Sequence, residues 1–99
     1  MPLDENTPGT HQFSRAGVHD HAPAESGVYV IHGLKSCLYV GESQNIRLRL
    51  LEHLADTNGC IMRHMPFTFA FELAQDGVRV ERQKEFILEF RPLCNPLSG

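Results

Sequence analysis

The sequence predicts one α+β domain, in which a small three-stranded antiparallel sheet is flanked by helices in the order β-β-α-β-α. Three observations predict this fold class. Val, Ile and Tyr alternate with period two over 28–32, and a second run over 37–40 follows a Gly/Lys/Ser turn, as in a β-hairpin. A pattern with helical spacing comes directly after this hairpin. A third alternating run then precedes a second helical pattern, which Pro92 ends.

The first predicted helix begins just after the hairpin, with Ser43 as its N-cap and residues 44–45 in its first turn. It should end near 56–59, because the Asn-Gly pair there can adopt the left-handed helix cap. Three apolar residues lie four positions apart on one face of this helix: Ile46, Leu50 and Leu54.

The second half of the chain predicts one strand and one helix. Residues 60–66 form a connecting stretch, and large apolar residues then alternate with smaller or polar ones over 67–73. A turn at 74–77 leads into a helix over about 78–90. The residues expected to face the sheet from this helix are Val80, Gln83, Phe86, Ile87 and Phe90.

Residues 1–25 are predicted to form a loop or flexible N-terminal arm before a domain over 26–99. Pro, Gly, Asn, Asp and His are common in this stretch, and Phe13 is its one candidate for a docked patch. Three histidines of the arm could form a metal cluster: His11, His19 and His21. A solvated polar tail is the favoured interpretation, because no fourth ligand is suitably spaced.

Composition restricts the class of protein. Ninety-nine residues can form one core without disulfides or structural metal. The net charge of −3 argues against a grip on nucleic acid by bulk electrostatics. No apolar run is long enough to span a bilayer and the N-terminus has no signal-peptide pattern, so we expect a cytoplasmic protein without membrane contacts.

The three cysteines are an odd number and have no Cys-x-x-Cys spacing: Cys37, Cys60 and Cys94. This pattern predicts reduced thiols rather than a disulfide framework or a zinc site. Cys37 falls inside a predicted strand, and we expect it to be a small core residue.

One set of motifs resembles the GIY-YIG nuclease superfamily. It consists of Gly27-Val28-Tyr29, Tyr39-Val40-Gly41, Arg49, His53 and a terminal Pro92-x-x-Asn95, and covers roughly residues 26–96. Either tripeptide alone would be weak evidence for this family. The tyrosines are ten residues apart, and the arginine and histidine follow the second tyrosine by ten and fourteen, which makes the resemblance strong.

The resemblance implies a metal-dependent DNA endonuclease that uses Mg²⁺ or Mn²⁺. Tyr39 matches the proposed general base or proton relay for the attacking water, and Tyr29 would orient water or phosphate. His53 would contact phosphate or relay a proton, and Asn95 would help to hold the site together. A free tyrosine is ionised in only about one molecule in a thousand at pH 7, so a cation such as Arg49 is needed nearby.

The second helix departs from the family pattern. Members carry a metal-binding glutamate twelve residues before the late asparagine, and counting back from Asn95 reaches Gln83. Glu81 and Glu85 flank this position, but they point roughly 200° and 160° around the helix from it. A neutral amide binds Mg²⁺ less firmly than a carboxylate does.

Three consequences of Gln83 stay open on sequence alone. The enzyme is weakened or only binds DNA; Glu81 or Glu85 takes over through a register shift; or the chain is a glutamate-to-glutamine variant of an active nuclease. The leading hypothesis is a DNA endonuclease. We expect its DNA substrate to be non-canonical or branched, and we expect a protein partner or self-association to contribute to specificity. The alternatives are a non-catalytic DNA-binding or protein-interaction module and an unrelated domain with chance motifs. The cations expected to contact DNA are Lys35, Arg47 and Arg63.

Overall fold

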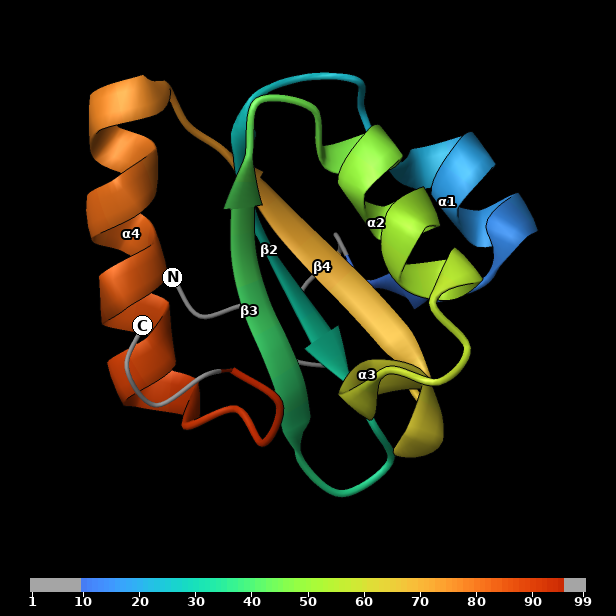
Figure 1. The fold of residues 1–99 in the computed structure, drawn as a ribbon. Helices are drawn as coiled ribbons and strands as arrows, with labels where there is room; N and C mark the ends of the chain where they lie inside the picture. Colours follow the sequence, from blue (N-terminus) through green and yellow to red (C-terminus); the bar gives the residue numbers. More distant parts are fainter. Residues whose placement is uncertain (1–9, 96–99) are drawn as a thin grey trace.

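The computed structural model describes residues 10–95 and shows a four-stranded sheet between two layers of helices (Figure 1). The elements in chain order are β1 (His11–Gln12), α1 (Arg15–His21), β2 (Gly27–His32), β3 (Cys37–Ser43), α2 (Ile46–Ala55), α3 (Cys60–Arg63), β4 (Thr68–Leu73) and α4 (Asp76–Phe90). The α+β class and the antiparallel sheet are confirmed, and β1 adds a short fourth strand. None of the helices within 10–95 is long and apolar enough to cross a membrane.

The sheet order is β1-β4-β2-β3, and every neighbouring pair is antiparallel. β2 lies in the middle, where it pairs with β3 across the hairpin and with β4 on its other side. Tyr29 pairs with Gly41 and Ile31 pairs with Tyr39, so both tyrosines lie on one face of the β2–β3 ladder.

Two cores form because successive strand side chains point to opposite faces. The face under α1, α2 and α3 is built from Phe13, Val18, Ala22, Tyr29, Ile31, Ile46, Leu50, Ile61 and Phe69. The face under α4 is built from Val28, Val30, Cys37, Val40, Ala70 and Phe86. Cys37 is the small core residue that the sequence predicts. Figure 1 shows α4 alone on one side of the sheet and the other helices on the opposite side.

The loop or flexible arm predicted over 1–25 is wrong for the residues that the structure describes, and 1–9 lie outside them. β1 pairs with β4, and Ser14 caps α1 by accepting a hydrogen bond from the Gly17 amide at 3.0 Å. Phe13 and Val18 are buried in the core. Each such burial stabilises the docked segment by about 1.5–3 kcal/mol, which outweighs its polar composition.

Two local predictions in the middle of the chain also need correction. Asn45, not Ser43, is the N-cap of α2, because its side chain accepts from the Leu48 amide at 3.0 Å. The Ser43 hydroxyl instead accepts from the Asn45 amide at 2.9 Å and so shapes the turn before the helix. The stretch 60–66, expected to be irregular, contains the one-turn helix α3, which Ile61 anchors in the core. α2 ends close to the predicted position, at Ala55, but the predicted left-handed cap is wrong, because its C-cap is Asp56 with a φ of −86° and Gly59 has a φ of −75°.

α4 begins at Asp76, inside the predicted turn, and its sheet-facing stripe agrees with the prediction at Phe86, Ile87 and Phe90 but not at Val80. Arg79 is buried, whereas Val80 is 39% exposed. The Arg79 guanidinium donates to the Ser26 hydroxyl at 2.8 Å, to the Asp76 carboxylate at 2.7 Å and to Glu42 on β3. An arginine that satisfies its donors in this way can replace an apolar residue on the sheet-facing side.

Candidate active site

The site begins with a contact between the centre of the sheet and α2. The Tyr29 hydroxyl on β2 lies 2.8 Å from Nε2 of His53, which is in the last turn of α2. Tyr29 is fully buried, and this burial, followed by the neighbouring Tyr39, raises the pKa of its phenol well above the usual range. Tyr29 therefore keeps its proton at neutral pH, and we assign its hydroxyl as the donor to His53.

His53 is held in its neutral form. Burial, and after it the positive charge of Arg49, lowers the pKa of the imidazole to about 4. Glu52 and Asp56 act in the opposite direction and do not reverse the shift. At pH 7 the ring can therefore accept the Tyr29 hydrogen bond at Nε2 while carrying its proton on Nδ1.

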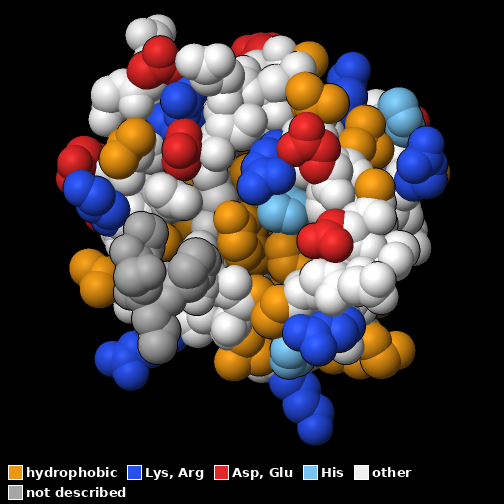
Figure 2. All heavy atoms as spheres, viewed as in Figure 1, with side chains coloured by type: hydrophobic (Ala, Val, Ile, Leu, Met, Phe, Trp, Pro, Cys, Tyr) orange, Lys and Arg blue, Asp and Glu red, His pale blue; other side chains and the backbone are white. Residues whose placement is uncertain are grey.

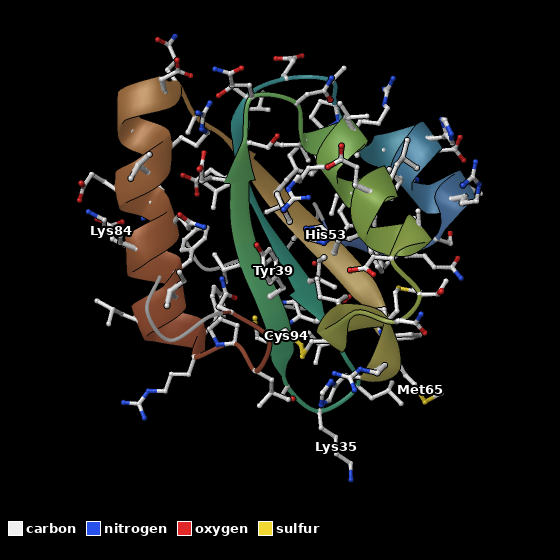
Figure 3. The ribbon with its side chains drawn as sticks, in the orientation of Figure 1. Lys35, Tyr39, His53, Met65, Lys84 and Cys94 are labelled. Carbon is white, nitrogen blue, oxygen red and sulfur yellow. A yellow bond between two sulfur atoms is a disulfide. The ribbon has the colours of Figure 1, made fainter. Side chains whose placement is uncertain are left out.

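Tyr39 completes an aromatic group around His53. Its ring centroid lies 4.8 Å from that of His53, edge to face, and 6.1 Å from that of Tyr29. Tyr39 is only half-buried, and its hydroxyl has no hydrogen-bond partner among residues 10–95. Figure 3 shows Tyr39 and His53 facing each other in the space between β3 and α2.

Gly41 makes this close arrangement possible. It lies opposite Tyr29 in the β2–β3 ladder, and a Cβ atom at this position would overlap the Tyr29 phenol and come within 2.8 Å of Cε2 of Tyr39. The glycine of the second tripeptide therefore serves the packing of both tyrosines, because no side chain fits between them.

A small pocket opens beside Tyr39 and His53, with a volume of about 170 Å³. Its lining residues are Tyr39, His53, Asp56, Gly59, Cys60, Ile61 and Cys94. This volume is below the range of about 300–1,000 Å³ typical of drug-sized ligands, so it suits a group of a few heavy atoms. Figure 2 shows acidic, basic and histidine side chains interspersed around an apolar hollow on this face.

Arg49 lies at the edge of the aromatic group rather than within it. Its side chain is 43% exposed, and its guanidinium donates to the Glu52 carboxylate at 3.0 Å. An exposed pair of this kind contributes about 0–1 kcal/mol, so Arg49 can exchange Glu52 for another anion at little cost.

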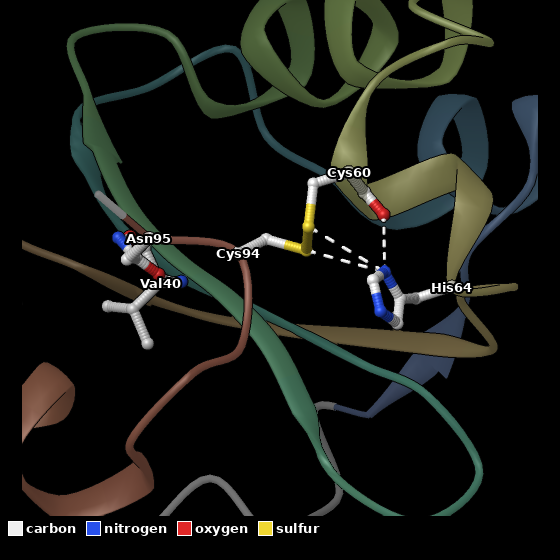
Figure 4. Close-up of a disulfide and its surroundings, with 5 residues drawn as sticks. All are labelled: Val40, Cys60, His64, Cys94 and Asn95. Carbon is white, nitrogen blue, oxygen red and sulfur yellow. Dashed lines mark hydrogen bonds between the residues drawn. A yellow bond between two sulfur atoms is a disulfide. The ribbon is translucent and has the colours of Figure 1, made fainter. Parts of the chain in front are cut away.

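Asn95 holds the free edge of the sheet beside the site (Figure 4). Its side-chain oxygen accepts from the Val40 amide, and its nitrogen donates to the Val40 carbonyl, both at 2.8 Å. The amides of Leu93 and Cys94 donate to the carbonyls of Cys37 and Leu38, which extends the same pairing along β3. The C-terminal segment thus covers the edge strand next to Tyr39.

The structure does not place Gln83 beside the tyrosines. Gln83 is half-buried on α4, between Arg79 and Phe86 on the sheet-facing stripe, and α4 covers the opposite face from Tyr39. A group at position 83 can approach the tyrosine side only around the edge strand β3.

The two candidate substitutes for a metal ligand, Glu81 and Glu85, point outward from α4. Glu81 has an exposed side chain near Lys84, and Glu85 accepts a hydrogen bond from Arg82. Figure 3 shows Lys84 on the outer side of α4, away from the sheet.

The three cations predicted to contact DNA have different surroundings. Lys35 and Arg63 are exposed, and Lys35 projects from the tip of the hairpin (Figure 3). Arg47 is half-buried, and its Nε donates to the Ala22 carbonyl at 2.8 Å. Arg47 therefore ties α2 to the segment after α1, and the DNA role of the three stays a prediction.

The prediction of reduced thiols is wrong for two of the three cysteines in this structure. Cys60 and Cys94 form a disulfide with a Cα–Cα distance of 5.7 Å, and Cys37 is free. The two partners are 34 residues apart in sequence and meet only because α3 and the C-terminal segment converge at the pocket. No signal in the sequence marks this pair. The i, i+4 spacing of Cys60 and His64 indicates only that these two side chains lie on one side of a helical turn.

Comparison with known proteins gives one family. A family model described as the GIY-YIG catalytic domain matches residues 25–91, about two thirds of the chain. No curated protein matches the chain.

Several crystal structures of the GIY-YIG N-terminal endonuclease domain of UvrC from Thermotoga maritima share the fold. The form bound to its catalytic divalent cation, magnesium, is 20% identical with a TM-score of 0.65, covering 76% of this chain and 88% of that one. A tyrosine-to-phenylalanine point mutant is 19% identical with a TM-score of 0.66, covering 76% and 88%. An asparagine-to-alanine point mutant is 19% identical with a TM-score of 0.66, covering 76% and 87%.

Proposed function

The chain belongs to the family of GIY-YIG catalytic domains, and from this premise we propose that it is a DNA endonuclease whose phosphodiester hydrolysis is impaired at the metal position. The observation that carries the proposal is the contact of Tyr29 with His53, with Tyr39 packed edge to face against the same imidazole. A core requires neither a half-buried tyrosine hydroxyl beside a small pocket nor a neutral histidine behind it.

A firmly bound Mg²⁺ or Mn²⁺ does not fit the residues present. Such cations prefer carboxylate oxygens, and position 83 offers a neutral amide. Four of the five glutamates on α4 and on the strands that face it are already paired with cations: Glu42 with Arg79, Glu72 and Glu85 with Arg82, and Glu81 with Lys84. The fifth, Glu89, is exposed in the last turn of α4. The UvrC structures hold their cation, whereas this chain would bind one only weakly, and we derive no step through a metal.

The side chains of the tyrosine face have roles that follow from their protonation. Tyr29 keeps its proton and fixes the orientation of His53 through the 2.8 Å hydrogen bond. Tyr39 presents a hydroxyl to the pocket, where it can relay a proton: the oxygen takes one from an attacking water as the hydroxyl gives its own to another acceptor.

Arg49 supplies a positive charge beside the aromatic group, close enough to act on Tyr29, Tyr39 and His53. Its guanidinium can leave the exposed Glu52 carboxylate and donate two hydrogen bonds to a phosphate in the fork geometry that arginine favours. Lys35 and Arg63 are exposed and free to contact the DNA backbone further out.

The test is cleavage of nicked, branched and plain duplex DNA with Mg²⁺ or Mn²⁺. We expect slow cutting by the natural chain, and a rise of at least about tenfold in Gln83→Glu, equivalent to about 1.4 kcal/mol. Gln75→Glu is the matched control, because it adds the same charge to an exposed position at the start of α4.

Removing the Tyr39 hydroxyl tests the catalytic part of the proposal. In the Gln83→Glu background, Tyr39→Phe should lower the cleavage rate by about a hundredfold, because it removes the group that handles the proton. Failure of Gln83→Glu to cut any of the three substrates, while it binds them, would exclude the impaired-nuclease proposal.

A second candidate is a non-catalytic DNA-binding or protein-interaction module on the same scaffold. It is favoured by the amide at Gln83 and by the net charge of −3. This candidate predicts DNA binding at low salt that is equal in the natural chain, Tyr39→Phe and Gln83→Glu, with no cutting by any of them. Branched substrates, a protein partner or self-association would then supply the specificity.

A further inference from the structure

A group of soft metal ligands borders the candidate active site. His64 Nδ1 lies 3.6 Å from Cys60 Sγ and 3.9 Å from Cys94 Sγ, and the three ligand atoms lie within 4.8 Å of one another (Figure 4). Cys60 and Cys94 also line the 170 Å³ pocket that Tyr39 and His53 share. The cluster is on the tyrosine side of the sheet and is separate from Gln83 on α4.

The backbone holds these three residues together independently of the disulfide. Cys60 and His64 are the first residue and the C-cap of the one-turn helix α3, so their side chains leave the same side of the helix. Cys94 is positioned by its own amide, which donates to the Leu38 carbonyl at 2.7 Å, and by the adjacent Asn95 side chain on Val40. After reduction the two thiols would therefore stay near each other.

The spacing agrees with a tetrahedral zinc site. Zn–S bonds of about 2.3 Å and Zn–N bonds of about 2.0–2.1 Å put a sulfur and a nitrogen ligand about 3.5 Å apart, and two sulfur ligands about 3.8 Å apart. The observed distances from His64 Nδ1 are 3.6 Å to Cys60 Sγ and 3.9 Å to Cys94 Sγ, close to the sulfur–nitrogen separation that zinc requires. Only the sulfur atoms need to separate, which breaking the disulfide allows.

We propose that the reduced form of this protein binds one Zn²⁺ through Cys60 Sγ, Cys94 Sγ and His64 Nδ1. A cellular dithiol, or two molecules of a monothiol, supplies two electrons and two protons and leaves as a disulfide, while the Cys60–Cys94 bond becomes two thiols. Zn²⁺ then displaces one proton from each thiol. In the reverse direction a cellular disulfide accepts two electrons from the two thiolates and leaves as its thiols. The Cys60–Cys94 bond then re-forms and the metal is released, so the site is occupied in one redox state only.

The His64 imidazole must give up one hydrogen bond in order to bind the metal. His64 Nδ1 lies 2.9 Å from the Cys60 carbonyl oxygen and donates to it when the proton is on Nδ1. Binding through Nδ1 moves that proton to Nε2, which points away from the metal. The His64 side chain is exposed, so water can replace the lost partner at little cost.

The ligand set selects the metal class. Two thiolates and one imidazole are soft to intermediate donors that suit Zn²⁺ and not Mg²⁺. Three protein ligands leave the fourth position for water, and the pocket beside Tyr39 and His53 provides the space for it. This site is independent of the hard-cation position at Gln83 and of whether the domain cuts DNA.

The test is metal binding by the whole chain, reduced with a phosphine under argon, with Co²⁺ as the spectroscopic probe. We expect one Co²⁺ per chain with a thiolate-to-cobalt absorption band, which Zn²⁺ displaces stoichiometrically. The oxidised chain should show no band. Equal binding by both redox forms, or no band in the reduced chain, would overturn the proposal.

The variants separate the site from general thiol chemistry. His64→Ala keeps both cysteines, which can still form the disulfide or be reduced to thiols. In the reduced chain it should weaken the affinity for Co²⁺ and Zn²⁺ on the order of a hundredfold. Cys94→Ser should abolish the band although Cys37 remains as a free thiol. His19→Ala is the matched control, because this exposed histidine of α1 is outside the cluster. Unchanged affinity in His64→Ala would refute the assignment of that ligand.

Discussion

The Tyr29 hydroxyl lies 2.8 Å from His53 Nε2 and joins the central strand β2 to the last turn of α2. The two residues are 24 positions apart in sequence, and both lie within the residues 25–91 that the family model matches. This contact is structural as well as chemical, because a fully buried phenol must place its hydroxyl on a partner. Its effects on stability can be separated from those on catalysis.

Tyr29→Phe should lower the free energy of unfolding by about 1–2 kcal/mol. The substitution keeps the ring in the core but leaves His53 Nε2 without its partner in a partly buried place. Tyr39→Phe is the matched control, because its hydroxyl has no hydrogen-bond partner within the described residues, and we expect a change below about 0.5 kcal/mol. Urea unfolding followed by circular dichroism measures both. Equal losses in the two variants would show that the hydrogen bond does not stabilise the fold.

His53 should make stability depend on pH in the acidic range. Its pKa is about 4 in the folded chain, below the usual 6.5, so the unfolded chain binds the proton first as pH falls. The imidazole therefore contributes to a loss of stability between pH 6.5 and 4 and to no further loss below that. Relative to His53→Asn, the natural chain should lose about 1–2 kcal/mol more between pH 7 and 4.5, because partial exposure screens the full effect.

The titration of the His53 ring protons by NMR measures the same property directly. A midpoint near 4 supports the arrangement in which burial and Arg49 oppose protonation. A midpoint near 6.5 would contradict it. Arg49→Gln should raise the midpoint, because it removes the nearby positive charge and leaves Glu52 and Asp56 in place.

Gly41→Ala should destabilise the fold by about 1–3 kcal/mol. Its Cβ would overlap the Tyr29 phenol and press on the Tyr39 ring, so the aromatic group would have to move. Gly77→Ala is the opposite case: it lies in the first turn of α4 with open space around the new Cβ. We expect that change to stabilise by about 0.5–1 kcal/mol, since alanine is the better helix former. Thermal unfolding of both variants gives the contrast.

The sequence predicts the parts of this fold that depend on local pattern. Alternation predicts the hairpin and β4, and helical spacing predicts α2 and α4 to within a few residues. The tyrosines, which the alternation puts on one face, come together as the spacing indicates. These features depend on residues that are close together in the sequence, so the sequence alone is enough to predict them.

What the sequence could not predict depends on contacts between distant segments. The segment that contains β1 and α1 has a polar composition, and it docks on the sheet because Phe13 and Val18 are buried in the core. The Cys60–Cys94 pair exists because the C-terminal segment runs along β3 to the side of α3. Arg79 is buried because three oxygen acceptors from β3, the loop before β2 and its own helix converge on it. None of these partners is marked by spacing or composition.

That convergence gives the last prediction. Arg79→Leu should lower the free energy of unfolding by about 2–4 kcal/mol, because it leaves the Glu42 carboxylate, 29% exposed, without its partner under α4. The double variant with Glu42→Gln should recover part of the loss, since a neutral amide tolerates the same place better. Lys84→Leu is the matched control: its pair with Glu81 is exposed on the outer side of α4, and the change should stay within about 0.5 kcal/mol. If Arg79→Leu and Lys84→Leu unfold at the same urea concentration, the buried pair does not hold α4 on the sheet.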